Sequence, residues 1–172
     1  MSLPFVVVEG PAEVLADAHA ELVSLGWEVT EDLTASARSG DRVWSLAVTD
    51  DATAALAVLA AVEGAGLLVD ARAERATVDR LCDDLRRLGR LDHRIGDPGP
   101  LLSAVERRLL DLLSDGVGLG AAATRLHLAR RTADRRLASA RSTLGVETTT
   151  QAIAAHRRRL DRLPRPGGSA PG

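Results

Sequence analysis

The sequence predicts two domains, an α/β domain over residues 1–97 and an all-α domain of four helices over residues 101–160. Short apolar runs of strand length alternate with helical segments up to residue 95, and every later periodic segment is helical. Between them, GDPGP (96–100) places two prolines and two glycines in five residues, which interrupts any regular element. We expect the domain boundary there. A Pro/Gly-rich tail without fixed structure is expected over 161–172.

The first domain is expected to form a small, mostly parallel sheet. Apolar runs of strand length occur at 4–8, 26–30, 42–48, 66–70 and 91–95. Apolar residues recur at intervals of three or four and predict helices at 12–25, 51–63 and 74–88. Strands that alternate with helices favour parallel pairing, but the pattern does not give the strand order.

The helices of the second domain are marked by their ends. Ser103 and Glu106 fit a capping box at the start of the first helix, and Gly116 suits its left-handed end. A short helix over 119–126, a tight turn and a third helix over 130–143 follow. Thr148 and Gln151 offer a second capping box, for a fourth helix that extends to about residue 159.

Charge divides between the two domains. Residues 1–100 hold 18 acidic and 9 basic side chains, whereas residues 101–172 hold 6 acidic and 13 basic ones. All of the basic residues are arginine. This asymmetry is typical of an acidic domain joined to one that binds nucleic acid.

Composition argues against several other classes. Cys82 is the only cysteine, the four histidines are scattered, and no nucleophile–base pair, carboxylate pair or phosphate loop stands out. We therefore expect no disulfide, no metal, no cofactor and no enzymatic activity. No run is apolar for long enough to span a membrane, and the N-terminus does not resemble a secretory signal, so a cytoplasmic protein is expected.

One face of the third helix is apolar and the other is basic. Ala133, Leu137, Ala140 and Leu144 recur at intervals of 4, 3 and 4 and predict a stripe that packs in the core. Arginines and small side chains occupy the rest of the helix. A short helix, a tight turn and a second helix with such an outer face are the parts of a helix-turn-helix that reads double-stranded DNA. A solvated basic face is the ordinary alternative for an arginine run.

Residues 102–152 resemble the LuxR-type helix-turn-helix family. LSAVERRLLDLLSDG (102–116) is similar to the opening of that family, and Leu144-Gly145-Val146 with Thr150-Gln151-Ala152 matches a fairly specific block without a gap. The resemblance implies a regulator that binds an inverted-repeat operator as a homodimer, with Ile153 and Leu160 of the fourth helix as dimer contacts. The residues expected at the DNA are Arg130, Arg131, Thr132, Asp134, Arg135, Arg136, Ala138, Ser139, Arg141 and Ser142.

Several positions depart from that family. Ala129 replaces the usual capping Ser or Thr, His127 replaces a turn glycine, and Arg136 stands where histidine is usual. Asp134 stands at a base-facing position where lysine is usual. It can accept from a cytosine amino group, or it can pair with a neighbouring arginine (130, 131 or 135), which is the interpretation we favour. In HRRR (156–159), phosphate contacts and a solvated helix end are both open.

The first domain resembles a truncated receiver domain, but its chemistry differs. A receiver needs an acidic pair after its first strand, an acceptor aspartate after the third and a lysine after the fifth. Here the first strand ends in Glu9 alone, Asp50, Asp51 or Asp70 would be the acceptor, and the chain has no lysine. We therefore expect a degenerate domain without ordinary aspartyl phosphorylation, suited to dimerisation, partner binding or sensing a small-molecule or protein signal.

Two side chains and one alternative function complete these expectations. Trp27 and Trp44 are interpreted as core residues, with a ligand or partner surface as the sharper alternative. The alternative to a transcription regulator is a protein-interaction module that heterodimerises with or sequesters another regulator.

Overall fold

The computed structural model describes residues 2–32, 41–96 and 101–166, and its elements divide into two compact units. The first unit is built from residues 2–96 together with 163–166, and the second from residues 101–162. The linker expected at 96–100 and the end of the expected tail fall largely outside the described residues. None of the described helices is long and apolar enough to cross a membrane.

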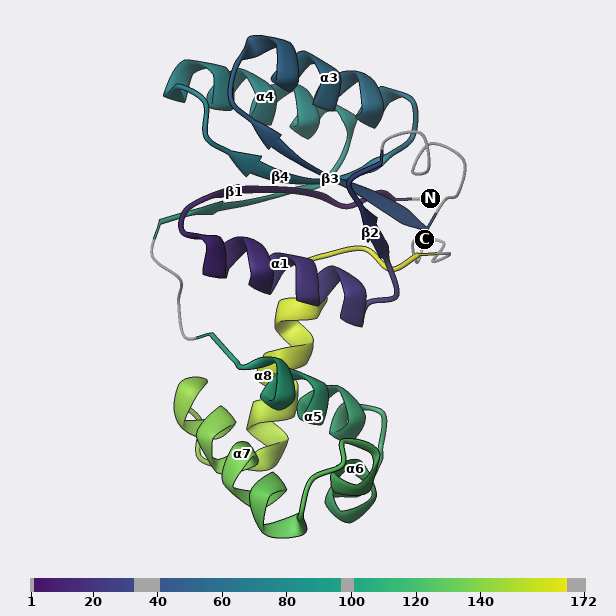
Figure 1. The fold of residues 1–172 in the computed structure, drawn as a ribbon, viewed down its shortest axis with the longest axis vertical. Coiled ribbons are helices and arrows are strands. Elements are labelled where there is room, and N and C mark those ends of the chain that lie inside the picture. Colours follow the sequence, from purple (N-terminus) through teal and green to yellow (C-terminus); the bar gives the residue numbers. More distant parts are fainter. Residues whose placement is uncertain (1, 33–40, 97–100, 167–172) are drawn as a thin grey trace. The chain divides into compact units, whose positions relative to one another are not determined.

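The first unit is a five-stranded parallel sheet with helices on both faces, as expected (Figure 1). Helix α1 covers one face, and α3 and α4 lie side by side on the other. The elements are β1 (Phe5–Glu9), α1 (Ala12–Ser24), β2 (Glu28–Thr30), β3 (Arg42–Val48), α3 (Asp51–Val62), β4 (Gly66–Ala71), α4 (Arg75–Leu88) and β5 (Leu91–Ile95).

The strand order is β2-β3-β4-β1-β5. The parallel α/β class is confirmed, and the structure supplies the strand order that the sequence pattern does not give. In this sheet β1 pairs with β4 and with β5, and its residues Phe5 to Val8 are at most 3% exposed. A strand covered on both faces has a continuous apolar sequence, which is why β1 could be predicted. The sequence pattern did not predict which strands pair with it.

The outer strand β5 and helix α1 share a buried network of charges. Arg94 donates to Glu21 at 2.6 Å and to Asp92 at 2.8 Å. Burial would lower the pKa of Arg94, but the carboxylates of Glu21 and Asp92 raise it above its usual value. These charges compensate one another inside the unit, which is the condition for burying them.

The segment after the last helix belongs to the first unit. Leu163 is 5% exposed, and the indole Nε1 of Trp27 donates to the carbonyl of Pro164 at 2.7 Å. Trp27 is 2% exposed, which agrees with its interpretation as a core residue. For residues 163–166 the structure therefore differs from the expected disordered tail, because their apolar side chains and a backbone acceptor complete the environment of Trp27.

The second unit contains four helices around an aliphatic core. They are α5 (Ala104–Ser114), α6 (Leu119–Arg125), α7 (Arg130–Thr143) and α8 (Thr149–Leu160). Ser103 with Glu106 and Thr148 with Gln151 form the two expected capping boxes. Gly116 has φ +82°, as its place after α5 predicts. The core includes Leu109, Leu110, Ala122, Leu137 and Ala152, all of them buried.

Candidate nucleic-acid interface

A tight turn joins α6 to α7. His127 takes φ +54°, its amide donates to Thr124 O at 3.1 Å, and the amide of Leu128 donates to Ala123 O at 2.9 Å. This pattern is a Schellman end, whose left-handed position normally carries glycine. Histidine at this position costs about 1–2 kcal/mol relative to glycine.

Helix α7 then begins without a side-chain cap. Ala129 has the extended backbone of an N-cap, but it offers no oxygen to the first amides of the helix, as the sequence predicts. The α6–turn–α7 segment thus consists of two helices joined by a Schellman turn, with two positions that weaken it locally.

The apolar stripe of α7 is confirmed. Ala133 and Ala140 are fully buried, Leu137 is 7% exposed, and Leu144 packs at the edge of the core. On the opposite face the exposed residues are Arg130, Arg131, Asp134, Arg135, Arg136, Ala138, Ser139 and Ser142, with Thr132 half-buried. Thr132, Arg135, Arg136 and Ser139 line an open hollow of about 330 Å³. The fold therefore brings the predicted DNA residues onto one surface.

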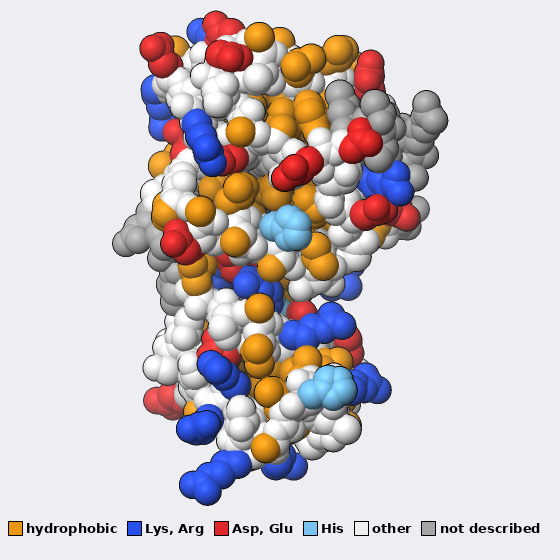
Figure 2. Space-filling view, in the orientation of Figure 1, with side chains coloured by type: hydrophobic (Ala, Val, Ile, Leu, Met, Phe, Trp, Pro, Cys, Tyr) orange, Lys and Arg blue, Asp and Glu red, His pale blue; other side chains and the backbone are white. Residues whose placement is uncertain are grey.

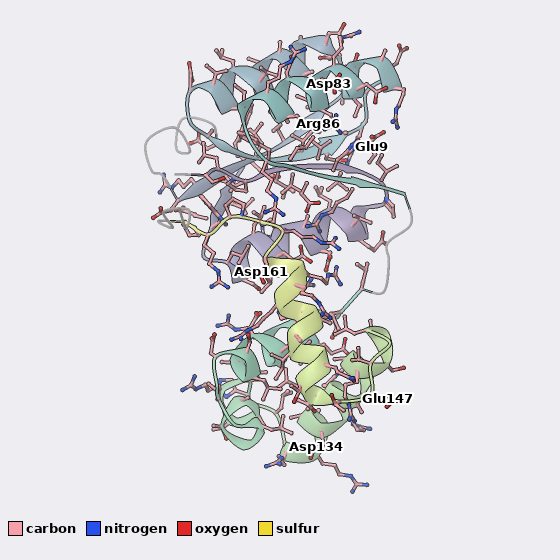
Figure 3. All side chains as sticks on the ribbon, turned by 180° about the vertical axis from the view of Figure 1, so that it is seen from behind. Glu9, Asp83, Arg86, Asp134, Glu147 and Asp161 are labelled. Carbon is pink, nitrogen blue, oxygen red and sulfur yellow. The ribbon has the colours of Figure 1, made fainter. Side chains whose placement is uncertain are left out.

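The outward arginines differ in how firmly the protein holds them. Arg130 Nε lies 3.6 Å from Asp134 Oδ2 across one helical turn, and both side chains are more than half exposed (Figure 3). This contact is of the kind that we favoured for Asp134. Among the described residues, Arg131 and Arg135 form no hydrogen bond or ion pair, so their guanidinium groups are free to bind a ligand.

Two predicted DNA residues already have partners within the unit. Arg141 donates to Glu147 O at 3.1 Å, in the loop that leads to α8, and it is half-buried. Ser139 lies near the carboxylate of Glu106 on α5 and helps to lower the pKa of that carboxyl. The Arg141 guanidinium is therefore less available to a phosphate than the arginines on the outer face.

Glu106 links the base of this surface to α5. Its burial would raise the carboxyl pKa, but hydrogen bonds from Ser139 and from Ser103, together with the charge of Arg136, hold that pKa below its usual value. The charged form is therefore favoured at neutral pH. Its negative charge lies near Arg136, whose positive charge contributes to the lowered pKa.

Helix α8 is more deeply tied to the unit than the sequence indicates. His156 is 2% exposed and its Nε2 lies 2.6 Å from Asp111 Oδ1, and Arg157 bonds to Ser114. In HRRR (156–159), His156 is therefore a core residue. Leu160 is 7% exposed and Ile153 is half-buried against the core, so the dimer contact expected there stays a prediction with little exposed surface behind it.

The acidic residues at the carboxyl edge of the sheet are all engaged locally. Asp50 caps α3, and hydrogen bonds from the backbone and the side chain of Thr53 lower its pKa. Asp51 accepts from Thr77 and Arg80, which likewise lowers its pKa. Asp70 pairs with Arg72. Each candidate acceptor of the degenerate receiver thus has a cap or an ion-pair role.

Sequence reasoning missed a group of three side chains at the same edge. His93 Nε2 lies 2.6 Å from Glu9 Oε1, and its Nδ1 lies 3.7 Å from Cys82 Sγ. The chain of contacts from Cys82 through His93 to Glu9 resembles a nucleophile, a base and an acid that orients the base. However, Cys82 is 1% exposed, and burial raises the pKa of its thiol to about 11, so the thiolate needed for nucleophilic chemistry does not form at neutral pH. The three residues are far apart in sequence, and no local motif announces them.

Comparison with known proteins adds little to this geometry. No protein-family model matches the chain, and no curated protein matches it. A solved structure, the response regulator ChrA of a heme-sensing two-component system, aligns at 17% identity over 92% of this chain and 98% of that one, with a TM-score of 0.34. A TM-score this low does not establish a shared fold.

Proposed function

We propose that this protein is a cytoplasmic bacterial transcription regulator that binds double-stranded DNA through the outer face of α7. The observation that carries the proposal is the pair of free, exposed guanidinium groups of Arg131 and Arg135, which project from a helix whose opposite face is locked in the core. An α-helix fits the major groove of B-DNA, and arginine is its most frequent reader of guanine.

Roles within the surface follow from exposure. Arg131 and Arg135 lie on the outermost line of the helix, where small neighbours such as Ala138 and Ser142 allow close approach to base edges. Arg130 and Arg136 flank that line and suit phosphate contacts. Arg141 would position the helix rather than contact DNA, since it bonds to the loop before α8, and Ser139 would lie beside Glu106 at the edge of the surface.

The regulator would act as a homodimer on an inverted repeat, as the LuxR-type resemblance implies. The α/β unit would set the oligomeric state or respond to a small-molecule or protein signal. Ordinary aspartyl phosphorylation is not expected, because Asp50, Asp51 and Asp70 have structural partners and the chain has no lysine.

A salt titration of binding to genomic DNA fragments tests the proposal. Neutralising several phosphates predicts a steep linear fall of log affinity with log salt concentration. Arg135→Ala should weaken binding about 10- to 100-fold, the range that a guanine-reading arginine contributes. The matched control is Arg72→Ala, which removes an exposed arginine that follows β4 in the other unit and should leave the DNA affinity unchanged. The absence of salt-sensitive binding would contradict the proposal.

One observation favours the second candidate, a protein-interaction module that heterodimerises with or sequesters another regulator. Part of the positive charge of α7 is offset within the helix, because Asp134 lies 3.6 Å from Arg130, and Arg141 is held by the backbone carbonyl of Glu147. A module of this kind would co-purify with its regulator from the host and would lack DNA binding when assayed alone. The two assays together separate the candidates.

A further inference from the structure

Helix α3 turns its alanines toward the sheet and its larger apolar side chains outward. The buried residues are Ala54, Ala57, Ala60 and Ala61. Leu56, Leu59 and Val62 are 49%, 53% and 63% exposed, at intervals of three residues. A surface helix ordinarily presents the reverse arrangement, and a helix that is apolar all round is ordinarily covered on both sides.

A groove between α3 and α4 continues this apolar face. It has a volume of about 550 Å³ and is lined by Ala55, Val58, Leu59 and Val62 from α3 and by Leu81 from α4. Figure 2 shows hydrophobic side chains gathered over α3 at the top of the view. Contiguous apolar surface of this kind marks a binding site more often than a free face.

The edge of the groove carries charges of both signs. Arg80 pairs with Asp51 at 2.6 Å, and Asp84, which also lines the groove, pairs with Arg87 at 3.3 Å. A second copy related by a two-fold axis presents the same mixed edge, so its arginines can face carboxylates and its apolar stripe can meet an identical stripe. A partner whose surface carries charges of one sign only would face like charges along part of this edge, and these would repel it.

We infer that α3 and α4 form the homodimer interface of this protein, with a second copy of the chain in the groove. The inference deepens the proposed function, which calls for a dimer, by naming the surface that makes it. It also explains why the α/β unit exposes leucine and valine, whereas the large apolar residues of α8, Ile153 and Leu160, are half-buried and buried in their own unit.

Analytical ultracentrifugation of the full chain without DNA tests the interface. The wild-type protein should be a dimer, and Leu59→Asp should weaken association at least about tenfold, because each copy would bury an unpaired charge at the centre of the contact. The matched control is Val23→Asp. Val23 is an exposed apolar residue of α1, 51% exposed, so its variant should stay dimeric. Circular dichroism establishes that both variants fold.

Cross-linking gives a second measurement that introduces no charge. A short bis-maleimide should join two copies of Leu59→Cys efficiently and two copies of Val23→Cys poorly. The native Cys82 does not compete, since its side chain is 1% exposed. If Leu59→Asp fails to fold, this comparison decides the question.

Each outcome has a definite meaning. A monomeric wild-type chain, an equally stable Leu59→Asp dimer, equal cross-linking at both positions, or occupation of the groove by a different protein or a small apolar ligand would overturn the inference. A dimer that Leu59→Asp disrupts, in a protein without DNA binding, would support the inference and reject the proposed function. Salt-sensitive DNA binding by a monomer would do the opposite.

Discussion

Helices α3 and α7 bury similar residues and expose opposite ones. Both turn alanines inward, Ala57 and Ala60 in α3 and Ala133 and Ala140 in α7, so both approach their cores closely. Outward, α3 presents leucine and valine, whereas α7 presents arginine. Because the buried faces of the two helices are alike, the difference between them lies in the exposed side chains, which are the ones available to a partner.

The two exposed faces also differ in what water does to them. Apolar surface left in water costs about 25 cal/mol per Å² relative to its burial, so the outer face of α3 gains free energy from any dry partner. Arginines in water are well solvated, and α7 gains mainly when a polyanion releases its counterions. The affinity for DNA should therefore fall steeply as the salt concentration rises, whereas the dimerisation affinity should change only weakly.

The largest expected effect is on the free energy of unfolding, when a buried leucine of α7 and an exposed leucine of α3 are each replaced by alanine. Leu137→Ala should lower the free energy of unfolding of the helical unit by about 2–5 kcal/mol, because it leaves a cavity beside α5. Leu59→Ala should change the stability of the monomer by less than about 0.5 kcal/mol, because that side chain is 53% exposed. Chemical denaturation at low protein concentration measures both. A similar loss for the two variants would contradict the assignment of faces.

A smaller effect should follow from removing the negative charge of α7. Asp134→Asn frees Arg130 and removes repulsion toward phosphate, so DNA affinity should rise by about fivefold, close to 1 kcal/mol. Fluorescence anisotropy at moderate salt measures the change. Glu28→Gln, an equally conservative change at an exposed residue of β2, serves as the control and should leave the DNA affinity as it is. Weaker binding by Asp134→Asn would instead indicate that Asp134 contacts a base.

The smallest change concerns the uncapped start of α7. Ala129→Ser supplies the missing oxygen to the first amides and should raise the free energy of unfolding by about 1 kcal/mol. Ala138→Ser places the same hydroxyl in the exposed middle of the helix, where it should be neutral or slightly destabilising. Thermal melts of the two variants test this difference. Equal shifts would show that the cap position does not limit stability.

Local chemistry made most elements predictable. Ser103 and Thr148 announce their helices because a capping box joins residues three apart, and Gly64 and Gly116 mark helix ends because both take positive φ. The spacing of Ala133, Leu137 and Ala140 predicted the correct buried face of α7, because residues three and four apart lie on one side of a helix.

Other features depend on contacts that no local pattern encodes. The strand order places β1 between β4 and β5, partners more than fifty residues away in sequence. The orientation of α3 was not readable because alanine, leucine and valine are all apolar, so the periodicity had no polar face to set it. His93 meets Glu9 through the pairing of β5 with β1, and it meets Cys82 because α4 packs against β5.

The bond between Trp27 and Pro164 bears on the order in which the molecule is made. Trp27 emerges early in translation, but Leu163 and Pro164, which complete its surroundings, follow the entire helical unit. The α/β unit therefore reaches its full set of hydrogen bonds only after the entire helical unit has been synthesised. A chain that ends within α8 would lack the carbonyl that accepts the indole N–H of Trp27.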